Sequence, residues 1–175
     1  LVIVGDGPAR EALEKQYPNH IYAGMRLGED LATHYASCDL FIFASITETF
    51  GNVVIEALAS GLPVLGYDYA APHEFIRTGE NGVLVPYDHE QAFLKGAEQL
   101  LAMRERLPRM KREARACMES LSWDNIIAGY EALLQDVADN GKVTVTPQCN
   151  NIAKLVGESD EPSEQLVSES PAEHA

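Results

Sequence analysis

Short, continuous apolar runs recur along the first half of the chain and alternate with longer segments of mixed polarity. Five runs have the length of β-strands: "LVIV" at residues 1–4, "HIYAG" at 20–24, "LFIFAS" at 40–45, "PVLGY" at 63–67 and "GVLVP" at 82–86. Within each run, apolar residues follow one another instead of alternating with polar ones, which is typical of parallel strands covered on both faces. The pattern therefore predicts a buried parallel sheet.

Helices are predicted between and after these strands. Segments with helical spacing occupy residues 9–17, 29–37 and 52–60, with a shorter one near 73–77. From Asp88, which can cap a helix, the helical pattern continues to about Asp136, with a break at Pro108. Strands and helices in alternation imply right-handed crossover connections. We therefore expect an α/β fold, a Rossmann-like, doubly wound parallel sheet followed by C-terminal helices.

The chain is expected to divide near residue 137. After about Asn140 the hydrophobic periodicity is lost, and only acidic charges follow Lys154. A segment of this composition buries too little apolar surface to fold. We expect one domain over residues 1–137 and an acidic disordered tail over 138–175 that takes no part in the site. Because the chain opens on Leu1, inside an apolar run, we interpret it as a fragment that lacks a first strand.

Composition narrows the classes of partner. The chain has 175 residues, 46% of them apolar, which is enough for one core. Its net charge of −14 disfavours nucleic acid and anionic lipid as partners of this surface. The cysteines at 38, 117 and 149 are odd in number and far apart, which indicates reduced cytoplasmic thiols and neither disulfides nor a zinc site. No run of about 20 apolar residues is present that could cross a membrane.

Two loops that follow predicted strands are candidates for a ligand site, since ligands of open parallel sheets bind beyond the carboxyl ends of the strands. The first is Gly5-Asp6-Gly7-Pro8. It is similar to a dinucleotide fingerprint, but Arg10 stands at the third glycine position and the next strand ends in "YAGMR", without an acid for the ribose. A ligand loop and a tight strand-to-helix turn, with Pro8 at the first helical position, both remain open.

The second loop, "TETFGNVVIE" at residues 47–56, leads into a helix. Gly51 and Asn52 begin that helix, whose free N–H groups and positive dipole end suit an anion such as a phosphate. Glu56 is one turn further on, among core-type residues, so we expect it close to desolvation unless hydroxyl groups bind it. Glu48 precedes the helix, on the other side of the phosphate position, and is placed to reach the group that is attached to the phosphate. The alternative is that Glu48 is a solvated loop acid and Glu56 a residue of the polar helix face.

The stretch "ETFGNVVIE" resembles the Glu-x7-Glu motif of retaining GT-B glycosyltransferases of the group 1 type, a family that includes bacterial mannosyl- and glucosyltransferases and sucrose synthase. The resemblance covers most of the chain. "VIVGDGPAREALE", "IYAGMRLGEDLATHYASCDLFIFAS", "EALASGLPVLGYDYAAPHEFIRTGENGVLVP" and "SWDNIIAGYEALL" are similar to successive blocks of the C-terminal, nucleotide-sugar-binding domain. The chain is therefore identified as the C-terminal half of a GT-B fold.

The resemblance implies a role for particular residues. Glu48 matches the acid that binds hydroxyls of the donor sugar, and it is the candidate catalytic residue. Glu56 matches the acid that holds the ribose. The residues between them match the loop whose backbone amides contact the sugar and the diphosphate, namely Phe50, Gly51, Asn52 and Val53. Segments that line the nucleotide pocket are matched by Gly5, Gly24, Met25 and Arg26.

The resemblance also implies parts that this sequence does not contain. The family carries an Arg and a Lys that neutralise the diphosphate, in and just after the strand before "LVIVG", and an N-terminal domain that binds the acceptor. We expect the chain alone to be inactive, because the leaving diphosphate lacks these cations. No metal and no cofactor are expected, since the cations and the helix N-terminus take the metal's place.

The function implied is transfer of a hexose, of mannose or glucose type, from a nucleotide diphosphate sugar (GDP-mannose or a UDP-sugar) to a lipid or glycan with retention of configuration. The acceptor would bind through the missing N-terminal domain, which would also provide any membrane association. We expect a cytoplasmic protein, and any attachment to the plasma membrane would be peripheral and at its inner face. The alternatives are a non-hydrolysing nucleotide-sugar epimerase of GT-B fold and a non-catalytic nucleotide-binding module.

Overall fold

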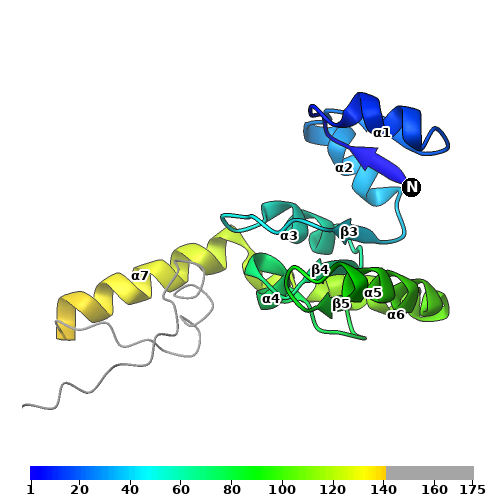
Figure 1. The fold of residues 1–175 in the computed structure, drawn as a ribbon. Helices are drawn as coiled ribbons and strands as arrows, with labels where there is room; N and C mark the ends of the chain where they lie inside the picture. Colours follow the sequence, from blue (N-terminus) through cyan, green and yellow to red (C-terminus); the bar gives the residue numbers. More distant parts are fainter. Residues whose placement is uncertain (141–175) are drawn as a thin grey trace, which may run out of the picture. The chain divides into compact units, whose positions relative to one another are not determined.

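The computed structural model describes residues 1–140 (Figure 1). These residues belong to two compact units, Leu1–Ser122 and a second unit that begins at Trp123. In the second unit, α7 spans Trp123–Asn140 and begins directly after Ser122. The predicted tail, 138–175, lies almost wholly outside the described residues, and the predicted boundary at 137 stays a prediction.

Five parallel strands confirm the α/β prediction, each shorter than its apolar run. β1 (Val2–Val4) pairs with β2 (Ile21–Gly24) in one ladder. In the other, β3 (Phe41–Phe43), β4 (Val64–Tyr67) and β5 (Gly82–Val85) are neighbours in that order. The arrangement corresponds to strands 3-2 and 4-5-6 of the doubly wound order 3-2-1-4-5-6. Within residues 1–140, the two ladders are not joined to each other by backbone pairing.

The crossover helices are α1 (Arg10–Gln16), α2 (Gly28–Ala36), α3 (Asn52–Ala59) and α4 (Ala70–Phe75). The first three lie where the spacing predicts them. α4 is a correction, because it begins at Ala70 and ends at Phe75 instead of spanning 73–77. Pro72 fits the first turn, where its missing N–H would have no partner. The chain then becomes extended at Ile76, whose side chain is buried.

The helices after β5 are α5 (Glu90–Ala102), the 3₁₀ turn η1 (Arg104–Arg106), α6 (Leu107–Ala116) and the 3₁₀ turn η2 (Glu119–Leu121). The N-cap of α5 is His89 and not Asp88, since His89 Nδ1 accepts from the amide of Ala92 at 3.1 Å. Asp88 has a left-handed backbone with φ of 52°. Pro108 lies in the first turn of α6, directly after the break that it predicts.

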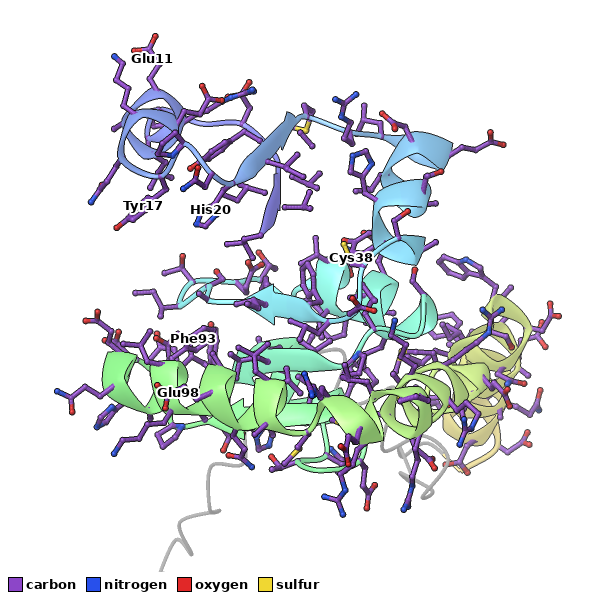
Figure 2. All side chains as sticks on the ribbon, turned by 90° about the vertical axis from the view of Figure 1, so that its right-hand side faces the viewer. Glu11, Tyr17, His20, Cys38, Phe93 and Glu98 are labelled. Atoms are coloured by element: carbon purple, nitrogen blue, oxygen red, sulfur yellow. The ribbon has the colours of Figure 1, made fainter. Side chains whose placement is uncertain are left out.

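The core surrounds β4, which is buried throughout. Val64 packs on one face with residues of α3 and α4, whereas Leu65 and Tyr67 pack on the other face with Phe93 of α5. Figure 2 shows Phe93 on the side of α5 that is turned toward the strands. Helices thus cover both faces of this sheet, as a doubly wound fold requires.

Burial is lower around the other sheet. β1 exposes Val2 and Val4, and neither α1 nor α2 contains a buried residue. The expectation that every strand is covered on both faces is therefore wrong for β1 within residues 1–140. On α7, apolar side chains such as Trp123, Ile127 and Tyr130 are exposed. None of the described helices combines the length and hydrophobicity needed to cross a bilayer.

Candidate functional site

The site predicted from the second loop lies where β3 ends and α3 begins. Gly51 is the N-cap of α3, with φ of 96° and ψ of 51°, and no side chain caps the helix. A Cβ at this position would lie 3.4 Å from Ala71 Cβ and 3.7 Å from Phe43 Cζ. The first N–H groups of α3 are thereby left for an anion, and the backbone can approach it closely.

The loop before α3 is attached to α4 on one side. The amide of Ala71 donates to the carbonyl of Phe50 at 2.9 Å. The Phe50 ring is half-buried and meets Phe75 edge to face, with ring centroids 6.2 Å apart. Asn52 and Val53, the first residues of α3, have exposed side chains, so their predicted contribution is through the backbone.

An open cavity of about 470 Å³ lies beside this loop. It is lined by Ile46, Thr47, Glu48, Thr49, Tyr69 and Tyr87. Glu48 is half-buried and is the one predicted site residue among them. A carboxylate, two threonine hydroxyls and two aromatic rings suit a polyhydroxylated ligand, because the oxygens accept and exchange hydrogen bonds while the rings provide an apolar wall.

Glu56 is exposed, which corrects the expectation that it is close to desolvation. Along α3 the buried residues are Val54, Ala57 and Leu58. At about 100° per residue, position 56 points away from them. Its carboxylate is not free, because the Tyr35 hydroxyl of α2 donates to Glu56 Oε2 at 3.1 Å.

The contact between Tyr35 and Glu56 changes the acidity of the phenol. Partial burial raises the pKa of Tyr35 well above its usual range, and the negative charge and hydrogen bond of Glu56 raise it further. The phenol therefore stays protonated and remains a donor to the carboxylate. One carboxylate oxygen of Glu56 is left for another hydroxyl group.

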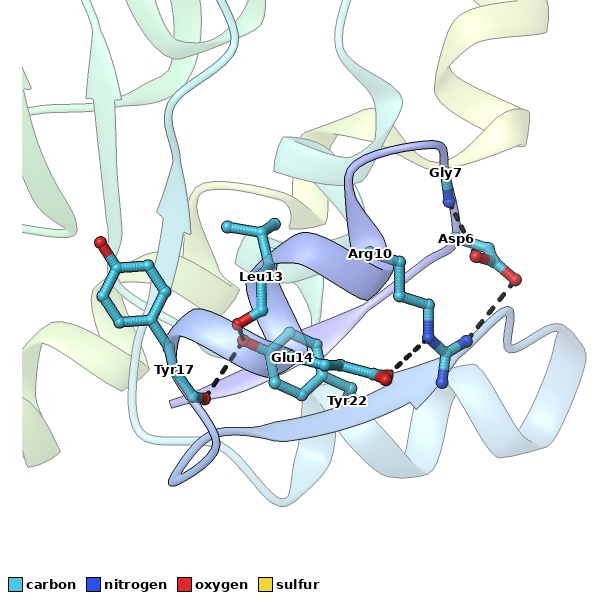
Figure 3. A network of polar contacts seen from close by, with 7 residues as sticks. All are labelled: Asp6, Gly7, Arg10, Leu13, Glu14, Tyr17 and Tyr22. Carbon is cyan, nitrogen blue, oxygen red and sulfur yellow. Dashed lines mark hydrogen bonds and ion pairs between the residues drawn. The ribbon is translucent and has the colours of Figure 1, made fainter.

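The first loop forms a network of its own (Figure 3). The amide of Gly7 donates to Asp6 Oδ1 at 2.8 Å, and Arg10 pairs with Asp6 at 3.5 Å and with Glu14 at 2.8 Å. The hydrogen bond that Arg10 Nε donates to the Glu14 carboxylate is the main cause that raises the pKa of Arg10. Hydrogen bonds and ion pairs among Asp6 of the turn and Arg10 and Glu14 of α1 thus hold the turn in place.

The structure brings Gly5 and Gly24 together. The amide of Gly5, whose φ is 129°, donates to the carbonyl of Gly24 at 2.9 Å. Gly24 has φ of 74°, which disfavours any residue with a Cβ, and a Cβ here would lie 3.0 Å from Arg10 Nη1, so that the guanidinium would have to shift slightly. Met25 is 64% exposed, and Arg26 pairs with Asp30 at 3.0 Å while its buried Nε has no partner among the described residues.

The two groups of predicted residues are connected through α2. Arg26 precedes this helix and pairs with Asp30 in its first turn, and Tyr35 near its end contacts Glu56. Among the described residues, no hydrogen bond or ion pair joins Met25 or Arg26 directly to Glu48 or Glu56.

Comparison with known proteins decides the family. Residues 1–103, which hold every predicted site residue, match the family described as glycosyl transferases group 1. This chain belongs to the glycosyl transferases group 1 family. Its α/β architecture agrees with a solved GT-B neighbour, the pneumococcal O-GlcNAc transferase GtfA in complex with UDP and GlcNAc, with a TM-score of 0.63. The two chains are 27% identical, and the match covers 78% of this chain and 29% of GtfA.

Two curated relatives are more similar in sequence. The GDP-mannose-dependent alpha-mannosyltransferase of Mycobacterium tuberculosis is 38% identical over 138 residues, which cover 76% of this chain and 36% of the relative. The protein of the same name from Corynebacterium glutamicum is 42% identical over 102 residues, which cover 58% and 25%. The chain thus spans about a third or less of the length of these relatives.

Sequence reasoning missed three tyrosines that contact the predicted site residues or line the cavity with them. Tyr69 and Tyr87 line the Glu48 cavity, and Tyr35 binds Glu56. Tyr69 and Tyr87 follow the carboxyl ends of β4 and β5, which is where ligands of such sheets bind, so their position was a usable signal. Tyr35 lies inside a helical segment, and nothing local to it points to Glu56.

Proposed function

We propose that this chain is the donor-binding part of a retaining glycosyltransferase that moves a hexose from a nucleotide diphosphate sugar to a lipid or glycan. One arrangement carries the proposal. Glu48 lines an open cavity, the left-handed Gly51 opens an uncapped α3 three residues later, and Glu56 stands exposed one turn along that helix. In the proposed binding mode, the donor sugar lies at Glu48, the diphosphate at the start of α3 and the ribose at Glu56.

Each group has a defined task in this proposal. The first N–H groups of α3 bind the diphosphate, because the helix dipole and the unpaired donors favour an anion there. Glu48 accepts hydrogen bonds from hydroxyls of the hexose and orients its reacting carbon, which makes it the candidate catalytic residue. Glu56 accepts from the ribose hydroxyls, held in orientation by Tyr35.

The arrangement of the two acids supports transfer in preference to hydrolysis. Hydrolases place two carboxylates on either side of the scissile bond, within about 5–10 Å of each other. Here only Glu48 lines the cavity, and Glu56 is bound to Tyr35 outside it. In the proposed reaction the departing phosphate oxygen takes the acceptor's proton on the same face of the sugar, so that configuration is retained.

The donor we propose to test first is GDP-mannose. Two relatives carry the name GDP-mannose-dependent alpha-mannosyltransferase, and one of them matches 76% of this chain. A UDP-sugar is the second candidate, because the solved GtfA structure contains UDP and GlcNAc. The acceptor, a cytoplasmic location and peripheral membrane attachment remain predictions that concern the whole protein.

Thermal unfolding of the protein with GDP, UDP, ADP or NAD, each at millimolar concentration, tests the proposal. A ligand at about 100 times its Kd adds roughly 2.7 kcal/mol to the free energy of unfolding, which raises Tm by several degrees. We expect GDP, or UDP in its place, to raise Tm while ADP and NAD do not. A shift with NAD alone, or with none of the four, would contradict the proposed function.

A further inference from the structure

Two tyrosine hydroxyls hold the backbone of the loop that carries Glu48. The hydroxyl of Tyr87 donates to the carbonyl of Ile46 at 2.7 Å, across 41 positions of sequence. The hydroxyl of Tyr69 donates to the carbonyl of Glu48 itself at 3.2 Å. The loop between the two carbonyls is therefore fixed from the ends of two other strands.

The two rings are themselves anchored in the core. Tyr69 and Tyr87 pack with ring centroids 5.0 Å apart, and Tyr87 meets Tyr67 at 6.3 Å. Tyr67 in turn packs against Phe93 at 4.8 Å, and both of these rings are buried. A continuous row of aromatic rings thus runs from the core to the edge of the cavity, which limits the movement of its exposed end.

The residue that follows each tyrosine has a left-handed backbone conformation. Ala70 and Asp88, the residues that follow Tyr69 and Tyr87, have φ of 50° and 52°. They are the two non-glycine residues with positive φ among the described residues. This conformation is unfavourable for a residue with a Cβ, and such conformations cluster at functional sites. Both tyrosines are thereby directed by turns that the surrounding structure must hold in place.

Tyr69 and Tyr87 also line the cavity with Glu48. The same two side chains therefore fix the loop and form part of the wall against which a ligand would lie. Tyr69 is 38% exposed and Tyr87 is 48% exposed, so part of each residue is open to solvent. The proposed diphosphate site at the start of α3 does not involve Tyr69 or Tyr87, because it consists of the backbone N–H groups after Gly51.

We propose that Tyr69 and Tyr87 form a clamp that positions Glu48 and sets the affinity for the hexose end of the donor. The inference rests on the proposed function and adds two positioning residues to it. Removing either hydroxyl frees one end of the loop and lets the Glu48 carboxylate move relative to the sugar. Affinity for a nucleotide without a sugar does not depend on that carboxylate and stays unchanged.

Calorimetric titration separates these effects. The protein and its Tyr69→Phe, Tyr87→Phe and double variants are titrated with GDP and with GDP-mannose, or with UDP and UDP-glucose if only UDP binds. Each Phe variant keeps the ring and loses one hydroxyl. The matched control is Tyr130→Phe, an exposed tyrosine of α7 that lies outside the cavity.

We expect each single variant to raise the Kd for the nucleotide sugar about fivefold, as the loss of one hydrogen bond implies, and to leave the Kd for the nucleotide within twofold. Unchanged affinity for the sugar nucleotide, or an equal loss for nucleotide and nucleotide sugar, overturns the clamp. If the unsubstituted protein binds none of these ligands, the proposed function fails and the clamp fails with it. This outcome can be told apart from a failure of the clamp alone, because it is seen with the unsubstituted protein before any variant is compared.

Discussion

At the residue scale, the site depends on contacts that modify otherwise ordinary side chains. Glu56 is exposed, yet its position is set by Tyr35, because the phenol donates to one of its oxygens. Glu48 is half-buried at the wall of a cavity and is held through its backbone carbonyl by Tyr69. The two acids of the motif thus have different environments and different partners, which agrees with two different binding roles.

Glu56→Gln tests the ribose role. We expect the Kd for the nucleotide to rise about tenfold or more, because hydrogen bonds to a charged acceptor are stronger than neutral ones. The free energy of unfolding should change by less than about 1 kcal/mol, since Glu56 is exposed. Glu98→Gln, at an exposed position of α5, is the matched control and should leave both quantities unchanged. Equal nucleotide affinity in Glu56→Gln and in the control would remove Glu56 from the site.

The Tyr35→Phe variant tests the hydrogen bond between Tyr35 and Glu56 through the pH dependence of the free energy of unfolding. Burial and Glu56 raise the pKa of Tyr35, so the folded state binds the phenolic proton more tightly than the unfolded state. The resulting stabilisation is fully present below the unfolded pKa of about 10 and is lost as pH rises above it. We expect the free energy of unfolding of the unsubstituted protein to fall more steeply above about pH 10 than that of Tyr35→Phe, measured by urea titration. Parallel curves would show that the contact contributes nothing.

At the scale of elements, the start of α3 is the part of the proposed site that is expected to bind an anion. The helix has no side-chain cap because its N-cap residue, Gly51, has no side chain, and the left-handed conformation of Gly51 leads the chain into the helix. A Cβ at Gly51 would make ordinary van der Waals contacts with Ala71 and Phe43, so the positive φ of 96°, and not a lack of space, favours glycine at this position. The same geometry that lets an anion approach the N–H groups therefore also requires this residue type.

Gly51→Ala should destabilise the protein by about 1–2 kcal/mol, because a left-handed conformation costs about that much for a residue with a Cβ. Nucleotide affinity should fall as well, since the first N–H groups of α3 would be displaced. Gly7→Ala is the control, because Gly7 has no positive φ and nothing lies within 4 Å of its Cβ position. Urea unfolding and calorimetry check both effects, and a Gly51→Ala protein as stable as Gly7→Ala would be evidence against the strained N-cap.

At the scale of the whole molecule, every predicted site residue lies in the unit Leu1–Ser122. This unit contains both ladders and the helices from α1 to α6. The residues that line the cavity and those that bind Glu48 and Glu56, as far as the structure describes them, all belong to this first unit. Donor binding is therefore expected to be a property of the first unit.

A chain ended after Ser122 should bind the nucleotide with the same Kd as the chain of 175 residues, because no site residue is removed. Circular dichroism before the titration shows whether the shorter chain is folded. A folded short chain that binds much more weakly would place part of the site in residues 123–175.

Metal dependence is also a question for the whole molecule. The family resemblance leads us to expect that excess EDTA leaves the Kd for the nucleotide sugar unchanged, because the N–H groups at the start of α3 take the place of a metal at the diphosphate. Calorimetry with and without EDTA, and with added Mg²⁺ or Mn²⁺, measures this. Binding that requires either cation would contradict the expectation.

The sequence by itself determined the parts of this protein that depend on local pattern. The five strands and α1, α2 and α3 follow from runs of apolar residues and from helical spacing. The start of α3 follows from Gly51, whose missing side chain permits the turn. Glu48 and Glu56 could be proposed as site residues because a strand end, a glycine and a helix start are close together in the chain, and their roles stay predictions. α4 was misplaced, since Pro72 is compatible with both a boundary and a first turn.

Only the tertiary structure decided which distant residues meet. Tyr87 reaches the carbonyl of Ile46 from 41 positions away, and Tyr69 and Tyr35 reach Glu48 and Glu56 from 21 positions away. These contacts depend on the order of the strands and on the faces that the helices bury, and neither is encoded near the tyrosines themselves. The exposure of Glu56 was decided in the same way, because the face of α3 that packs on the core is the one opposite to it.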